Sequence, residues 1–188
     1  TTTTFDYGQM KRIELSSGGC YQVGNAILAI EAARALGIAE PAIRYGLRTA
    51  KLMGRFQVLG RRPLIIVDGA HNPQKMAAFV EALKAVVDTK HKRLVCLYAM
   101  KSTKDLRKTL QSLAPVLDAV VITTFSRSYS PHTVRRVLRS LNPHVRIVLQ
   151  LNPRVAYTAW RRSLQPDDIG IITGSLYLIG YLRKAKLL

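Results

Sequence analysis

A compact group of polar side chains begins at Asp68, in a segment with the sequence DGAHNP that directly follows the apolar run 64–67. A carboxylate such as Asp68 can accept hydrogen bonds from hydroxyl groups, for example those of a ribose. His71 and Asn72 add polar groups where a helix is expected to begin, and the first N–H groups of a helix favour anions. A second interpretation stays open here: Asn72 caps the helix, Pro73 occupies its first turn, and His71 has no ligand role.

Three further positions combine a turn with a polar side chain. Arg55 follows a glycine, and a guanidinium in such a turn can reach a phosphate, with an ordinary surface arginine as the alternative. Ser175 follows an apolar run and a glycine, so its hydroxyl either caps the next helix or contacts a ligand. The third position is the pair Lys104-Asp105. Lys104 could face an anion, or Asp105 could simply be a residue in the first turn of a helix.

Two common nucleotide-binding motifs are missing from the chain. The 188 residues contain no GxxxxGK[ST] segment, so no Walker A loop holds a triphosphate in this sequence. The GxGxxG fingerprint is also missing, which argues against a nicotinamide-dependent Rossmann enzyme. His91, His132 and His144 lack the spacing of metal ligands, so the sequence predicts no metal site of its own.

Alternating apolar runs and helix-length segments predict the elements that hold these residues. Strands are expected at 64–67, 93–98, 118–123, 145–149 and 169–173, and helices at 74–87, 104–113, 133–141, 154–164 and 176–183. Upstream we expect a strand at 9–15, a helix at 22–36 that Gly37 ends, a helix at 40–50 and a hairpin over 56–67.

The predicted strands are apolar on both faces, and helices separate them. This pattern predicts an α/β fold with a Rossmann-like, mostly parallel sheet and helices on both faces. In such folds ligands bind at the carboxyl ends of the strands. Asp68 and Ser175 both follow predicted strands and are therefore expected at this edge.

Composition limits the class of protein. A hydrophobic content of 48% is enough for a packed core. No apolar run approaches the roughly 20 residues that span a bilayer, so no membrane association is expected. Cys20 and Cys96 form no CxxC pair, which favours a cytoplasmic location. The first residues lack the pattern of a secretory signal, and the initial threonine suggests a fragment.

The chain is strongly basic, with 29 Lys and Arg against 11 Asp and Glu and a net charge of +18. Three interpretations are open: a solvated surface, a site for an anionic small molecule or acidic partner, and a nucleic-acid surface. The basic pairs are scattered, and no helix-turn-helix, zinc-finger or RRM signature is present, so nucleic acid is the least favoured.

Four segments, in order, resemble folylpolyglutamate synthase, an enzyme of the Mur ligase superfamily that often doubles as dihydrofolate synthase. They are Tyr21-Gln22-Val23-Gly24-Asn25-Ala26, Gly54-Arg55-Phe56, Asp68-Gly69-Ala70-His71-Asn72-Pro73 and Gly174-Ser175-Leu176-Tyr177-Leu178-Ile179-Gly180.

The resemblance implies a ligase that adds L-glutamate to folate or dihydropteroate, with ATP and Mg²⁺, through an acyl phosphate. It implies that residues 1–52 are the short helical end of the central ATPase domain and that residues 53–188 are the Rossmann-like C-terminal domain. The P-loop and the Mg²⁺ ligands would then lie outside this chain, in the missing N-terminal and central parts, and the isolated chain would be inactive.

The same resemblance assigns roles to individual residues. Asn25 is expected to contact adenine, and Arg55 to reach the ATP phosphates from the hinge between domains. Asp68 would contact the ribose, with His71 beside the nucleotide. Arg55 and His71 are thereby the candidate catalytic residues.

The incoming amino acid also has candidate ligands. The resemblance makes Arg127 a candidate to bind it, and Ser175 is a second candidate. The alternative to a ligase is a stand-alone basic α/β module that binds nucleic acid or an acidic protein and depends on neither Asp68 nor Arg55.

Overall fold

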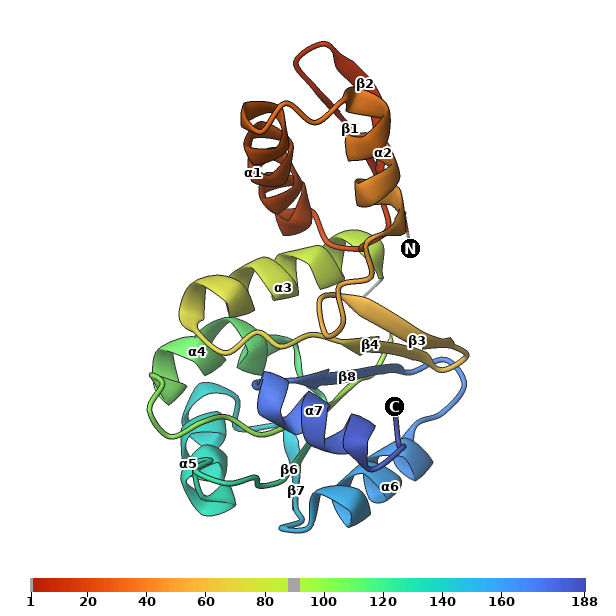
Figure 1. Cartoon of the computed structure of the whole chain (residues 1–188). Helices are drawn as coiled ribbons and strands as arrows, with labels where there is room; N and C mark the ends of the chain where they lie inside the picture. Colours follow the sequence, from red (N-terminus) through yellow and green to blue (C-terminus); the bar gives the residue numbers. More distant parts are fainter. Residues whose placement is uncertain (1, 88–91) are drawn as a thin grey trace. The chain divides into compact units, whose positions relative to one another are not determined.

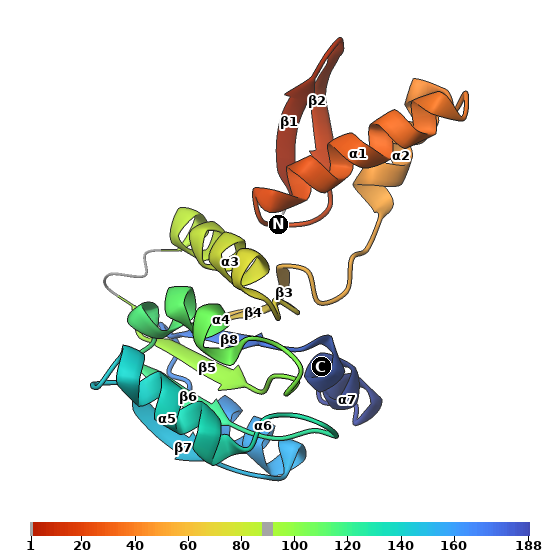
Figure 2. The same ribbon diagram turned by 90° about the vertical axis from the view of Figure 1, so that its left-hand side faces the viewer.

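The computed structural model describes residues 2–87 and 92–188, which divide into two compact units (Figures 1 and 2). The first unit extends to Gln57 and the second begins at Val58. His91 lies outside the described residues. No helix among the described residues is long and apolar enough to cross a membrane.

The first unit contains a hairpin and two helices. Strands β1 (Thr3–Tyr7) and β2 (Met10–Leu15) pair antiparallel, and helices α1 (Tyr21–Ala35) and α2 (Glu40–Thr49) follow. Apolar side chains from β2, α1 and α2 form a small core, with Met10, Ile13, Ile30 and Ile43 at its centre. Helix α1 is followed by Gly37 at φ +72°, the left-handed conformation in which glycine commonly ends a helix.

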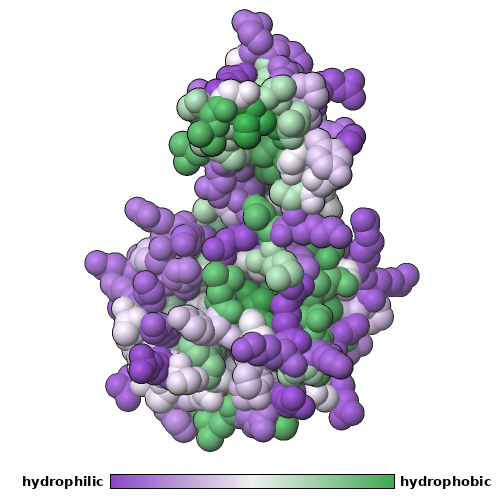
Figure 3. Space-filling model, in the orientation of Figure 1, coloured by the Kyte–Doolittle hydropathy of each residue, from purple (hydrophilic) through white to green (hydrophobic). Residues whose placement is uncertain are grey.

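Helix α1 is apolar on its outer side as well as on its core side. Ile30 is fully buried, whereas Leu28 and Leu36 are 72% and 79% exposed. In Figure 3, apolar residues gather over α1 in this unit. These exposed side chains do not contribute to the core of this unit.

The second unit is one six-stranded sheet with the strand order β3-β4-β8-β5-β6-β7. Its strands are β3 (Gln57–Arg61), β4 (Leu64–Val67), β5 (Leu94–Tyr98), β6 (Ala119–Ile122), β7 (Arg146–Leu149) and β8 (Ile169–Thr173). All pairs among β4, β8, β5, β6 and β7 are parallel. The two-residue connection between β3 and β4 turns the chain back, as the sequence predicted for a hairpin over 56–67.

Helices cover both faces of this sheet. They are α3 (Pro73–Val86), α4 (Leu106–Leu113), α5 (Pro131–Leu141), α6 (Pro153–Ser163) and α7 (Leu176–Lys184), with a short 3₁₀ turn at Ala114–Val116. Helices α3, α4 and α5 pack side by side on one face, and α6 and α7 cover the other (Figures 1 and 2). The predicted α/β architecture is therefore confirmed, although helix α4 begins at Leu106 rather than at residue 104.

The core beneath α6 and α7 is closed by Trp160, which is fully buried. Its indole N–H donates a hydrogen bond of 3.1 Å to the carbonyl of Val95, which satisfies the polar atom of a large apolar side chain. Gly170 makes room for the ring, because a Cβ atom there would lie 2.8 Å from Trp160 Cζ2. This packing fixes the central strands whose carboxyl ends carry the candidate site.

Candidate functional site

The strand order brings two distant segments together at the carboxyl edge of the sheet. Strand β8 lies between β4 and β5, so the turn that follows β4 meets the turn that follows β8. The Asp68 N–H donates to the Ile172 carbonyl at 3.0 Å, and the Gly174 N–H donates to the Ala70 carbonyl at 3.1 Å. This is the edge at which an open α/β sheet binds its ligands.

The turn after β4 is held by its own polar side chains. Asp68 is buried, and its Oδ1 accepts a hydrogen bond of 2.8 Å from the Ala70 N–H. His71 Nδ1 lies 2.7 Å from the Gly69 carbonyl oxygen. Since a carbonyl can only accept, Nδ1 carries the proton, and in the neutral ring Nε2 keeps a free lone pair. Asn72 Oδ1 accepts from the Lys75 N–H at 2.9 Å, so the expected cap of α3 is present.

The turn after β8 requires a glycine. Gly174 has φ +96°, and a Cβ atom there would lie 2.6 Å from both the Ala99 carbonyl oxygen and Tyr98 Cε2. The next residue, Ser175, is buried and accepts a hydrogen bond of 3.0 Å from the Tyr177 N–H. Its hydroxyl thus has the capping role that the sequence left open beside a ligand role.

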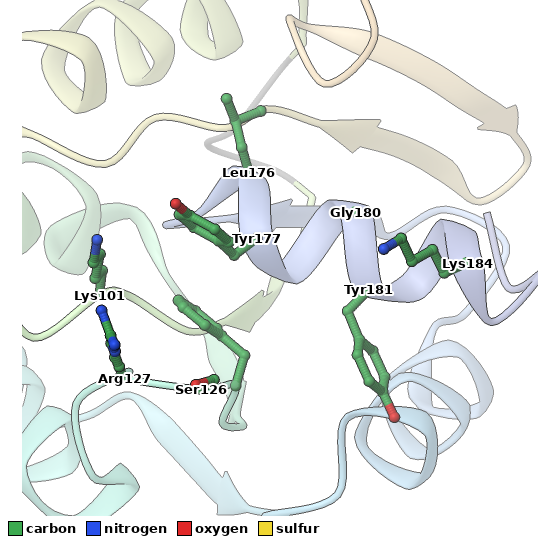
Figure 4. Close-up of a pocket in the computed structure, with 9 residues that line it drawn as sticks. Lys101, Ser126, Arg127, Leu176, Tyr177, Gly180, Tyr181 and Lys184 are labelled. Carbon is green, nitrogen blue, oxygen red and sulfur yellow. The ribbon is translucent and has the colours of Figure 1, made fainter.

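A pocket of about 500 Å³ lies beside this edge, within the second unit. It is bounded by the segments that follow β5 and β6 and by one side of α7 (Figure 4). Its lining consists of Lys101, Phe125, Ser126, Arg127, Leu176, Tyr177, Gly180, Tyr181 and Lys184. Of the candidates for binding an amino acid, the pocket includes Arg127 and not Ser175.

Two loops hold Lys101 and Arg127 at the same end of the pocket. The Ser102 N–H donates to the Arg127 carbonyl at 3.0 Å, and the Tyr129 N–H donates to the Met100 carbonyl at 2.8 Å. Arg127 itself has φ +63°, a left-handed conformation that costs a non-glycine residue about 1–3 kcal/mol. Backbone strain of this kind is concentrated at ligand-binding sites.

An aromatic pair forms the wall between these loops and α7. The rings of Phe125 and Tyr177 stack with centroids 5.9 Å apart and an interplanar angle of 17°. Lys101 Nζ lies 5.5 Å from the centroid of the Tyr177 ring, within the range of a cation–π contact. Tyr177 is nevertheless 64% exposed, so the platform has one face open.

The charge of the pocket has one sign. Lys101, Arg127 and Lys184 line it, and no acidic side chain is among the lining residues that the structure describes. Three cations on partly apolar walls attract a small anion, and a guanidinium suits a carboxylate because it can donate two parallel hydrogen bonds. The pocket is therefore suited to a compact ligand with more than one carboxylate.

The first unit carries the two other candidates. Asn25 is exposed on α1 and donates a hydrogen bond of 2.7 Å from Nδ2 to Oε1 of the buried Gln22, which leaves Asn25 Oδ1 open to a donor. Arg55 lies in a tight turn in which Ser17 Oγ donates to its carbonyl at 3.2 Å. The Arg55 guanidinium is only half-buried and donates to the Gly54 carbonyl at 3.4 Å.

Other sequence candidates have plain structural roles. Asp105 caps α4 by accepting from the Lys108 N–H at 3.0 Å, and Lys104 is exposed. Tyr98, which was not a sequence candidate, is buried beside the turn at Gly174; burial raises its pKa well above the usual value, and its neutral hydroxyl lies 3.0 Å from Met100 Sδ. Among the described residues, no three His, Cys, Asp or Glu side chains gather as metal ligands do.

Sequence reasoning missed most of the pocket. Lys101, Phe125, Tyr181 and Lys184 were not among the candidates, and Tyr177 appeared only as part of a motif. One signal was available: Tyr177, Tyr181 and Lys184 recur at helical spacing on the helix that follows Gly174, and thus share one face.

Comparisons with known proteins agree with this architecture. Residues 54–176 match the family model described as Mur ligase, glutamate ligase domain. A probable bifunctional folylpolyglutamate synthase/dihydropteroate synthase of Haloferax volcanii is 32% identical over 88% of this chain and 20% of that protein. The Escherichia coli dihydrofolate synthase/folylpolyglutamate synthase is 38% identical over 50% of this chain and 22% of that protein.

Solved structures show the same relation. A Mycobacterium tuberculosis folylpolyglutamate synthase complexed with ADP has a TM-score of 0.82 at 25% identity, over 93% of this chain and 42% of that chain. The chain thus spans about a fifth of the two curated relatives and less than half of the solved enzyme.

Proposed function

Because this chain belongs to the Mur ligase family, as a C-terminal domain of the folylpolyglutamate synthase type, we propose that it serves an ATP-dependent ligase that adds L-glutamate to folate or dihydropteroate. The isolated chain would be inactive, because its sequence has no Walker A loop. Its partner would be the remaining N-terminal and central ATPase part of the ligase. A cytoplasmic location stays a prediction from cysteine usage.

The reaction joins a carboxylate to an amine in two steps. The acceptor carboxylate attacks the γ-phosphorus of ATP, which forms an acyl phosphate and releases ADP. The glutamate nitrogen then forms a bond to the acyl carbon, the bond from that carbon to the phosphate oxygen breaks, and the ammonium proton passes to solvent or to a base. This chain would supply the groups that hold the glutamate and exclude water from the acyl phosphate.

The observation that carries the proposal is the charge of the pocket. Glutamate has two carboxylates, and the pocket offers Lys101, Arg127 and Lys184 without an acidic neighbour in its lining. A diamino acid would meet like charges there, and alanine would leave cationic groups unpaired. The pocket also lies at the carboxyl edge of the sheet, where an α/β domain binds its ligands.

The nucleotide contacts are proposed residue by residue. Asn25 would accept from the adenine amino group, since its Oδ1 is open, and Arg55 would bind phosphate oxygens. Asp68 would accept from ribose hydroxyls, and His71 would lie beside the nucleotide with Nε2 available. Mg²⁺ would neutralise phosphate charge, with its protein ligands in the part of the ligase outside this chain.

A ligation assay tests the proposal. The chain extended upstream through the ATPase part, and the 188-residue chain alone, are incubated with ATP, Mg²⁺, radiolabelled glutamate and either dihydropteroate or a reduced folate. We expect glutamate incorporation by the extended protein only. A folded extended protein that binds ATP and incorporates no glutamate with either acceptor would contradict the proposal.

A matched pair of variants tests the pocket. Arg127→Ala should raise the KM for glutamate about tenfold or more, because a charged hydrogen bond contributes about 1.5–3 kcal/mol. Arg136→Ala removes an equally basic side chain from the exposed face of α5, away from the pocket lining, and should leave the KM unchanged. If Arg127→Ala leaves the KM for glutamate unchanged, the pocket does not bind the glutamate substrate.

One surface favours the alternative of a polyanion-binding module. Helix α5 exposes Arg135, Arg136 and Arg139, with no acidic residue in the helix. Two results together would favour this second function. The protein would bind duplex DNA in a salt-sensitive way that is abolished when the three arginines are changed to glutamate, and the extended protein would incorporate no glutamate. Ligation by the extended protein, with no such binding at physiological salt, would exclude it.

A further inference from the structure

The pocket has two cationic ends, and only the first contains Arg127, the residue that the sequence resemblance suggests for the incoming amino acid. Lys101 and Arg127 form the first end, on loops that two backbone hydrogen bonds tie together. Lys184, the last residue of α7, forms the second end. Figure 4 shows Lys184 on the opposite side of Tyr177 from Lys101 and Arg127.

The Lys184 ammonium is available to a ligand. Within the described ranges 2–87 and 92–188, its Nζ has no ion pair or hydrogen bond, and the residue is exposed. In Figure 4 its nitrogen lies on the side of the residue that faces Gly180. A lysine that lines a pocket in this way presents a charge without a counter-charge.

Gly180 lies between these two ends, and protein packing does not explain it. It sits inside α7, where glycine is less favourable than alanine, and its φ is not in the left-handed region. A Cβ atom there would have no heavy atom within 4 Å. The missing methyl group therefore leaves the floor of the pocket open along α7, between Tyr177 and Lys184.

The direction of the ligand follows from the position of α7. The helix begins next to the carboxyl edge of the sheet, immediately after Ser175, and Lys184 lies about 12 Å further along its axis. The reacting amine must lie near the sheet edge, with the α-carboxylate beside it. The distal carboxylate of the same amino acid then extends away from that edge, along Gly180.

We propose that Lys184 is a specificity-determining residue, which binds the side-chain carboxylate of the incoming amino acid where it lies over Gly180. Lys101 and Arg127 hold the α-carboxylate at the other end. The inference rests on the proposed function, and it explains why a pocket for a single amino acid has a third cation so far from the sheet edge.

Steady-state kinetics of the extended ligase test this role. Lys184→Gln should raise the KM for glutamate about tenfold, with kcat and the KM for ATP unchanged, because only a ground-state charge contact is lost. Lys184→Arg should restore most of the affinity. Lys186→Gln is the matched control, since Lys186 is an exposed lysine just beyond the same helix that does not line the pocket.

Two further variants separate a binding role from a structural one. Lys184→Glu should shift the amino-acid preference toward a cationic side chain. The ratio of kcat/KM for ornithine to kcat/KM for glutamate should be at least tenfold higher than in the wild type. Gly180→Ala should raise the KM for glutamate without loss of folded protein, because its methyl group would enter the pocket and meet no protein atom.

The outcomes distinguish this inference from the proposed function. An active wild-type ligase in which Lys184→Gln and Lys186→Gln have the same KM for glutamate would overturn the role of Lys184 alone. If the wild-type extended ligase incorporates no glutamate, the proposed function and this inference are overturned together. A raised KM confined to Lys184→Gln, with rescue by arginine, would establish it.

Discussion

Gly174 and Gly180 lie six residues apart, and the structure predicts opposite effects when each is changed to alanine. Gly174 has φ +96°, and an added Cβ would lie 2.6 Å from the backbone oxygen of Ala99. The left-handed backbone costs alanine about 1–2 kcal/mol. The overlap forces a backbone shift that costs about a further 1–3 kcal/mol. Gly174→Ala should therefore destabilise the second unit by about 2–5 kcal/mol.

Gly180→Ala should have the opposite sign. The position is helical, and the new methyl group would have no heavy atom within 4 Å. Alanine is favoured over glycine inside a helix by about 0.5–1 kcal/mol, so this variant should be slightly more stable than the wild type. The pair thus separates the demands of the fold from the space kept open for a ligand.

Urea unfolding followed by tryptophan fluorescence measures both changes. Trp160 is the only tryptophan in the sequence and is fully buried in the second unit, so its signal reports that unit alone. With an m-value of about 2 kcal/mol per molar urea, Gly174→Ala should lower the midpoint by about 1–2.5 M. A midpoint equal to that of the wild type would refute the steric reasoning.

Three further predictions concern stability. Burial alone would raise the pKa of Asp168, but hydrogen bonds from Arg93 and from the Gln165 N–H lower it. The stabilisation that Asp168 provides is therefore present above pH about 4 and is lost as the pH falls through the folded pKa. Asp168→Asn should remove this contribution to the pH dependence of the unfolding free energy between pH 2 and 7, and an unaltered pH dependence would contradict the prediction. Ser175→Ala should cost about 1 kcal/mol in urea unfolding and leave the KM for glutamate unchanged, whereas a raised KM would restore its ligand role. Leu28→Lys replaces an apolar side chain that is 72% exposed on α1, so it should leave the free energy of unfolding within about 0.5 kcal/mol of the wild type; a larger loss, measured by urea unfolding followed by circular dichroism, would contradict the exposed placement.

The regular part of the fold could be predicted because its pattern is strong. Strands such as β8, with five buried residues, and helices with one apolar face follow directly from periodicity. The strand β1 was not among the expected elements, although its β-branched threonines favour a strand, and it pairs Thr3 with Leu15.

The pocket could not be predicted from local pattern because its residues meet only through the strand order. Lys101 and Arg127 come together through backbone hydrogen bonds between two loops, and Lys184 joins them only because β8 lies between β4 and β5. Periodicity predicts strands but not their order. The cap made by Ser175 and the turn at Gly174 could be anticipated, since both depend on neighbours in sequence or on a glycine.

The separation between the pocket and the core has an evolutionary consequence. Lys101, Arg127 and Lys184 are surface residues on two loops and a helix end, and none of them contributes a side chain to the buried cluster around Trp160. Under the proposed function, substitutions at these positions can therefore alter which amino acid is preferred at little cost to folding. A lineage with this scaffold can change its amino acid in single mutational steps, without prior stabilising mutations, whereas Gly174 has no such freedom.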